Sequence, residues 1–176
     1  QNGRALLDPR VDVVNADAMI WLRDEAPKLP QWDVLIADFP DPSTYSLGKL
    51  YTTRFYRLAA AVLAPDGAMS VQATSPMLAR RSFWCIARTI EGAGLAVRAY
   101  HTAVPSFGEW GYVLASHRPF EVPDKLSARQ LRFLTDEVLP TLFLFSADTD
   151  RVDADVNSLN NQILVQYYES EWARWN

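Results

Sequence analysis

Short runs rich in β-branched residues alternate with longer amphipathic segments along this chain. The first such runs cover residues 11–16, 33–38 and 68–74, and apolar side chains recur at helical spacing between them. This alternation favours a layered α/β fold, because parallel strands need long, usually helical, crossover connections. With 176 residues, 49% of them hydrophobic, we expect a single domain over residues 1–176 with its own core.

The run DVLIAD at residues 33–38 carries the clearest strand signal. Its side chains are almost continuously apolar, as is typical of a strand covered on both faces in a parallel sheet. The run ends in FPDP at residues 39–42, and its two prolines cannot continue a strand ladder. We therefore expect an extended loop at the carboxyl end of this strand.

Later segments complete the predicted sheet. Residues 95–101 and 110–116 are separated only by a short loop, so we expect them to pair antiparallel. A mostly parallel sheet with one reversed strand late in the chain is typical of the methyltransferase-like variant of the doubly wound fold. Caps, breakers and apolar spacing predict helices from Asp17 to about 22, at 47–64, from Ser75 to about 91, from a Ser127–Gln130 capping box to 138, and at 159–172.

Charge and cysteine content exclude several classes of protein. Lys and Arg number 17 against 21 Asp and Glu, which argues against a nucleic-acid partner. The single cysteine, Cys85, permits neither an internal disulfide nor a cysteine-based zinc site, and its apolar neighbours predict a small core residue on a helix. With no signal peptide and no apolar run near the roughly 18 residues that span a bilayer, we expect a soluble, cytoplasmic chain.

Polar side chains occur where the predicted strands end. Ligands of open α/β sheets bind beyond the carboxyl ends of the strands, so we expect an anionic crevice there, suited to a cationic substrate. A carboxylate directly after VLIA is partly desolvated, which costs free energy unless it is paired or used. Two of the acids have a purely structural alternative, as caps of a helix and of a turn. The candidates are Asp38, Gln72 and the 101–109 loop, with Asp17 and Asp41 as the two possible caps.

Five stretches, in this order, resemble one known family. They are DPRVDVVNADAMIWL (8–22), DVLIADFPDPSTYSLGKLYTTRFYRL (33–58), VQATSP (71–76), VPSFGEWGYVLAS (104–116) and VNSLNNQILVQYYESEW (156–172). The D-x-x-D-P block with its downstream L-Y-x-x-x-F-Y is the most specific of them. By these stretches the chain resembles the polyamine aminopropyltransferases, or spermidine synthases, in their bacterial long form.

The resemblance implies transfer of an aminopropyl group from decarboxylated S-adenosylmethionine to a diamine such as putrescine, with release of methylthioadenosine. The attacking amine is protonated at neutral pH, because its pKa is near that of lysine, roughly 10. The enzyme therefore needs carboxylates that orient and deprotonate it. Neither a metal nor a nicotinamide cofactor is implied.

The resemblance also implies roles for individual residues. Asp38 is implied to be the base, and Asp41 to anchor the attacking amine. Gln72 is implied to form a hydrogen bond near the same amine. The residues implied to contact the adenine are Asp17 and Ala18.

The chain departs from the family pattern in four features. The G-G-G-D-G turn, the acid after the following strand and the amino-terminal β-domain are absent, so we expect a carboxyl-terminal part of a longer enzyme, lacking the first strands of the sheet and inactive by itself. The loop at 104–108 lacks the tyrosine that many members offer to the substrate, which leaves the diamine open. Trp110, just after that loop, either lines the diamine site or fills the core.

The resemblance also bears on oligomeric state and membrane attachment, and two alternative functions stay open. The family resemblance implies a homo-oligomer, and the long form implies a parent protein attached to a membrane. The alternatives are a methyltransferase that uses S-adenosylmethionine, and a non-catalytic relative that binds a nucleoside or a polyamine. In a methyltransferase, the two carboxylates of D-x-x-D-P would have no natural substrate group to pair with.

Overall fold

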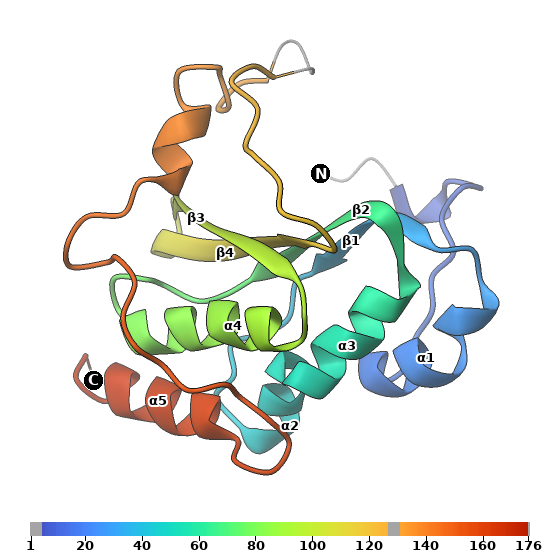
Figure 1. Ribbon diagram of the computed structural model, residues 1–176, viewed down its shortest axis with the longest axis horizontal. Coiled ribbons are helices and arrows are strands. Elements are labelled where there is room, and N and C mark those ends of the chain that lie inside the picture. Colours follow the sequence, from blue (N-terminus) through green and yellow to red (C-terminus); the bar gives the residue numbers. More distant parts are fainter. Residues whose placement is uncertain (1–4, 127–130, 176) are drawn as a thin grey trace.

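A computed structural model describes residues 5–126 and 131–175 and contains a four-stranded sheet (Figure 1). The strand order is β1-β2-β4-β3, with β1 and β2 parallel and β4 antiparallel to both of its neighbours. β4 is therefore the one reversed strand in the described ranges, which confirms the predicted reversed strand late in the chain. The strands are β1 (Trp32–Ala37), β2 (Leu63–Gln72), β3 (Ala96–Val104) and β4 (Gly108–Ser116).

The α-helices lie together on one side of the sheet, as Figure 1 shows. The core lies between sheet and helices, where Phe83 and Ile86 of one helix are fully buried with Val71 and Val113 of the strands. Across the described residues, no helix is long and apolar enough to span a membrane. The helices are α1 (Ala18–Asp24), α2 (Tyr45–Gly48), α3 (Thr53–Val62), α4 (Arg80–Gly92) and α5 (Ile163–Trp172), with 3-10 turns η1 (Ala5–Leu7), η2 (Ala26–Lys28), η3 (Lys49–Tyr51) and η4 (Leu139–Phe143).

The predicted strand at residues 11–16 is wrong. This segment is exposed and pairs with no strand in the part of the chain that the structure describes. A strand is stabilised by hydrogen bonds to a neighbour, and β1 pairs with β2 alone among the described residues. The sequence pattern predicts the conformation of a strand but not the partner that it needs.

The expected burial of β1 on both faces is also wrong. Leu35 and Ala37 are buried against the helices, whereas Val34 and Ile36 on the other face are 65% and 74% exposed. On this other side of the sheet, η4 lies above β3 (Figure 1). It contacts β3 through Phe143 and Tyr100, whose ring centroids are 5.7 Å apart, and β3 lies at the opposite edge of the sheet from β1.

The predicted helix at residues 47–64 is interrupted at Thr52. The Thr52 hydroxyl accepts a hydrogen bond from the Phe55 backbone N–H at 3.3 Å and donates to the Lys49 carbonyl at 2.8 Å. Because this side chain caps α3, the backbone turns extended between η3 and α3. Residues 65–67, directly after the predicted helix, lie inside β2, where the register with β1 shifts.

The helix predicted from Ser75 begins later, at Arg80. The Ser75 hydroxyl instead caps the preceding turn, accepting from the backbone N–H groups of Met77 and Leu78 at 3.3 and 3.2 Å. The last helix also begins later than predicted, at Ile163. The predicted helix to 138 is wrong over residues 131–138, which form bends and turns, and its capping box at 127–130 lies outside the described residues.

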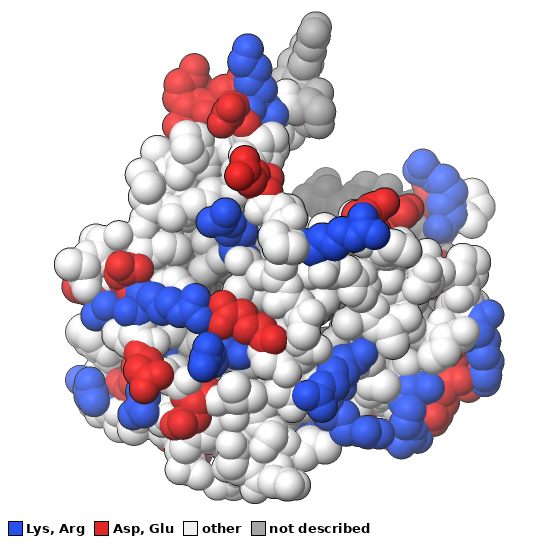
Figure 2. All heavy atoms as spheres, viewed as in Figure 1, with Lys and Arg blue, Asp and Glu red and all other residues white. Residues whose placement is uncertain are grey.

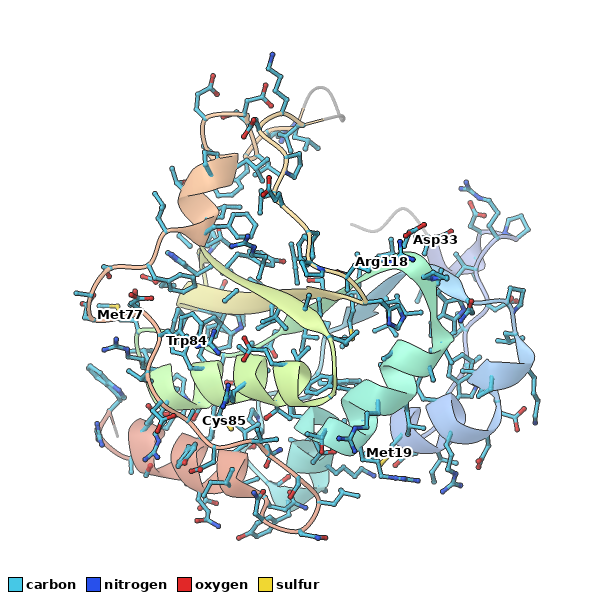
Figure 3. All side chains as sticks on the ribbon, in the orientation of Figure 1. Met19, Asp33, Met77, Trp84, Cys85 and Arg118 are labelled. Carbon is cyan, nitrogen blue, oxygen red and sulfur yellow. The ribbon has the colours of Figure 1, made fainter. Side chains whose placement is uncertain are left out.

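Cys85 is a buried residue of α4, as predicted, and Figure 3 shows it on the side of α4 that faces α5. Burial raises the pKa of its thiol to about 12. The thiol is therefore protonated and unreactive at neutral pH.

The amino-terminal end of α4 is capped by Glu171 of α5. Its two carboxylate oxygens accept from the backbone N–H groups of Arg81 and Ser82 at 2.7 and 2.9 Å, and from the Ser82 hydroxyl at 2.7 Å. A carboxylate at this end also interacts favourably with the helix dipole. Glu171 therefore joins α4 and α5.

We expect Glu171→Ala to lower the free energy of unfolding by about 1.5 kcal/mol, because two backbone donors and a hydroxyl lose their acceptor. Urea denaturation of the purified chain measures this change. Glu169→Ala on the same helix is the matched control, since Glu169 is exposed. Equal losses in the two variants would contradict the capping role.

Candidate active site

The carboxyl ends of β1 and β2 lie at one edge of the sheet, because the two strands are parallel neighbours. Asp38 directly follows β1, and Gln72 is the last residue of β2. The structure thus brings together four of the predicted site residues, Asp38, Asp41, Gln72 and Trp110. A pocket of about 500 Å³ is lined by Asp38, Phe39, Pro40, Asp41, Gln72, Val104, Phe107, Trp110 and Tyr112.

Asp41 is held by three hydrogen-bond donors. The Gln72 side-chain amide donates to Oδ1 at 2.9 Å, and the Thr74 hydroxyl donates to Oδ2 at 3.0 Å. The Tyr168 hydroxyl, from α5, donates to Oδ2 at 2.9 Å. The Asp41 carboxylate is therefore held both by residues at the end of β2 and by a residue of α5.

Tyr51 fixes the orientation of Gln72. The Tyr51 hydroxyl lies 3.1 Å from Gln72 Oε1 and 3.1 and 3.2 Å from the carbonyls of Pro40 and Phe39. Burial, together with the charges of the two nearby aspartates, raises the pKa of Tyr51, so its hydroxyl remains a donor. The amide oxygen of Gln72 therefore faces Tyr51, and its NH₂ group faces Asp41.

Asp38 differs from Asp41 in both exposure and contacts. We expected a partly buried carboxylate, and this expectation is wrong, because Asp38 is exposed at the pocket. No group in the part of the chain that the structure describes donates a hydrogen bond to it. One aspartate is thus held by three donors, whereas the other is exposed at the pocket.

Aromatic rings form the opposite wall of the pocket. Phe107 and Trp110 lie with ring centroids 5.3 Å apart, and Tyr112 stacks on Tyr100 at 5.1 Å. Trp110 is half-buried and belongs to this wall, which supports the first of its two predicted alternatives. Aromatic faces beside carboxylates suit the methylene chain and the charge of an alkylammonium.

Asp17 and Ala18 lie outside this pocket. Asp17 caps α1, accepting from the backbone N–H groups of Met19 and Ile20 at 3.0 and 3.2 Å, so it has the structural role that was one of its two predicted alternatives. Lys49 donates to its other oxygen at 2.6 Å, and this hydrogen bond holds the pKa of Asp17 below its usual range.

Ala18 lines a separate, larger pocket of about 960 Å³. Its walls include Trp21 and Trp32, whose stacked rings lie 5.5 Å apart. The two residues implied to contact the adenine are therefore placed near this second pocket and not beside Asp38.

The sequence profile of the spermine/spermidine synthase domain matches residues 2–124. The chain belongs to this family. It is 43% identical over 98% of its length to a polyamine aminopropyltransferase of Leptospira interrogans, and 46% identical over 97% to polyamine aminopropyltransferase 2 of Ralstonia nicotianae. The chain spans about a third of the length of these relatives, 34% and 33%.

Solved structures of spermidine synthases resemble the fold of this family member. One, in complex with the transition-state analogue AdoDATO, has a TM-score of 0.67 and 27% identity, covering 80% of this chain and 50% of that one. The enzyme from Thermotoga maritima has a TM-score of 0.64 and 27% identity, covering 80% and 49%. These similarities confirm the predicted methyltransferase-like fold.

Three residues of the site escaped the sequence analysis. Tyr51 lies in the L-Y-x-x-x-F-Y stretch but was assigned no role in the site, although its hydroxyl contacts Gln72. Thr74 lies two residues after the end of β2, and its place at a strand end was the available signal that it belongs to the site. Tyr168 lies beyond the residues that the family profile matches, and although it falls in the 156–172 stretch of the resemblance, nothing in that stretch indicates its contact with Asp41.

Proposed function

We propose that this chain provides the diamine side of an aminopropyltransferase site, which transfers an aminopropyl group from decarboxylated S-adenosylmethionine to a diamine such as putrescine. The observation that carries the proposal is a contrast within one aromatic-walled pocket: Asp38 is exposed and has no donor among the described residues, whereas Asp41 is held by three donors. Membership of the family and relatives named polyamine aminopropyltransferase support it.

In the proposed reaction the diamine enters as an ammonium ion. Asp41 accepts a hydrogen bond from it and orients it, and Asp38 takes one of its protons. The amine lone pair then attacks the methylene carbon next to the sulfonium, forming a C–N bond as the C–S bond breaks. The electron pair stays on sulfur, which leaves as the neutral thioether of methylthioadenosine, so the leaving group needs no acid.

Electrostatics suit these substrates, since the sulfonium and the diamine are both cationic. The formal charge of the chain is −4. Figure 2 shows basic and acidic side chains interspersed over one face of the molecule. The two carboxylates of the pocket supply a local negative potential that attracts a cation.

The nucleoside contacts of Asp17 and Ala18 stay predictions. The pocket that Ala18 lines has room for a nucleoside, whereas both oxygens of Asp17 already accept hydrogen bonds. A homo-oligomer and attachment of a longer protein to a membrane also stay predictions, which sedimentation and membrane fractionation of the full-length protein test.

We expect the full-length protein that carries this sequence to release methylthioadenosine from decarboxylated S-adenosylmethionine only when a suitable amine is present. Chromatographic detection with putrescine, cadaverine and spermidine, each tested separately, measures the release and identifies the amine. A folded protein that releases none with any amine would contradict the proposal and favour a non-catalytic relative.

A further inference from the structure

The Tyr168 hydroxyl reaches Asp41 across 127 positions of the sequence. Tyr168 is half-buried on α5, and its ring lies 5.7 Å from that of Trp172. Burial, followed by the negative charge of Asp41, raises the pKa of Tyr168. Its hydroxyl is therefore a proton donor to Asp41 throughout the neutral range.

Thr74 holds the same oxygen of Asp41 from a strained backbone. Its φ of +60° lies in the left-handed region, which is strongly disfavoured for a β-branched residue. Its side chain is fully buried, and its carbonyl accepts from the backbone N–H of Gly111 at 2.8 Å. A Cβ at Gly111 would lie 2.8 Å from that carbonyl oxygen, so only glycine permits this approach of β4. Strain maintained by the surrounding structure is typical of functional sites.

The helix that carries Tyr168 is itself secured against α4. Glu171 caps the first turn of α4, and the Arg81 guanidinium lies 4.1 Å from the centre of the Tyr167 ring. Tyr168, between these two contacts, is thus held in position relative to the sheet.

The donors occupy specific lone pairs of the Asp41 carboxylate. A carboxylate offers roughly four acceptor sites, two on each oxygen. Thr74 and Tyr168 take both sites of Oδ2, and Gln72 takes one site of Oδ1. With the donors of residues 5–126 and 131–175 counted, one site remains, on Oδ1, the oxygen that Gln72 contacts.

We propose that Tyr168 and Thr74 are positioning residues which occupy Oδ2 of Asp41 and so direct the attacking ammonium of the diamine to Oδ1. The inference rests on the proposed function, because it assigns the remaining acceptor site to that substrate. It extends the site to α5, which lies beyond the residues matched by the family profile.

Tyr168→Phe in the full-length protein tests the proposal. We expect the KM for the diamine to rise about 10-fold, the size expected for loss of a hydrogen bond to a charged group, while the KM for the nucleoside changes less than about 2-fold. Tyr167→Phe is the matched control, since it makes the same change one residue away, where the hydroxyl donates to Asp155. Thermal unfolding of both variants reports any general loss of structure.

Two outcomes of this experiment would overturn the proposal. One is an unchanged diamine KM in Tyr168→Phe, and the other is an equal change in Tyr167→Phe. A merely structural role would alter both substrates' KM values and the unfolding midpoint together.

Thr74 supplies a second, independent test. Thr74→Val keeps the branched shape and removes the hydroxyl, whereas Thr74→Ser keeps the hydroxyl. We expect a larger rise of diamine KM in Thr74→Val than in Thr74→Ser, and the reverse order would contradict the role of the hydroxyl.

Calorimetric titration with putrescine separates failure of this inference from failure of the proposed function. If the wild-type protein binds putrescine without turnover, the proposed reaction fails, but an approximately 10-fold weaker Kd in Tyr168→Phe still supports the positioning role. An equal Kd in the two proteins, or no binding by the wild type, would overturn it.

Discussion

Asp38→Asn is expected to slow aminopropyl transfer by about 100-fold or more in the full-length protein, the usual size of a general-base contribution. The amide cannot take a proton from the attacking ammonium, whereas it keeps the size and hydrogen-bonding shape of the carboxylate. Because Asp38 lines the pocket and contacts no donor among the described residues, the substitution removes no structural hydrogen bond there. Single-turnover release of methylthioadenosine measures the rate.

Asp33→Asn is the matched control for this variant. Asp33 is an exposed residue at the opposite end of β1, and Figure 3 labels it there. We expect its transfer rate to equal that of the wild type, and we expect nucleoside binding to be nearly unchanged in both variants. Transfer by Asp38→Asn at the wild-type rate would contradict the proposal that Asp38 is the base.

Asn157→Ala is expected to lower the free energy of unfolding by about 3 kcal/mol, the largest effect on stability that we predict. Asn157 is fully buried. Its Nδ2 donates to the carbonyls of Gly48 and Tyr51 at 3.3 and 3.0 Å, and its Oδ1 accepts from the Leu164 N–H at 3.3 Å. Alanine would leave these three buried backbone groups without partners.

Urea denaturation of the chain measures this loss, and Asn160→Ala is the control. Asn160 is an exposed asparagine three residues along the same segment, so we expect a change within about 0.5 kcal/mol. Equal losses would show that the buried amide contributes nothing specific. Because Asn157 joins α5 to the turn that carries Tyr51, its loss also loosens two elements that support the site.

Local patterns predicted much of the sheet. The apolar run of residues 33–38 became β1, and the short loop before Trp110 became the antiparallel β3–β4 pair. Parallel pairing of β1 and β2 then placed Asp38, Asp41 and Gln72 at one edge. These predictions succeeded because strand conformation, loop length and the direction of parallel strands depend on residues close together in the sequence.

Patterns that depend on a distant partner failed or gave no signal. The run at 11–16 has the composition of a strand, but pairing needs a neighbour that its own residues do not supply. The predicted helix at 47–64 breaks at Thr52, since a buried hydroxyl there competes with the helical hydrogen bonds. Likewise, nothing in the pattern around Gln72 indicates that Thr74, two residues beyond the end of β2, has a positive φ.

The sequence by itself determined the family, the fold class and the acids of the site, because these are written in residue types at fixed spacing. Only the tertiary structure decided how the two aspartates differ. Asp38 remains exposed, whereas Asp41 accepts from Gln72, Thr74 and Tyr168. The physical reason is that a side chain's environment is set by the elements packed against it, and α5 reaches Asp41 only after the chain has folded back over α4.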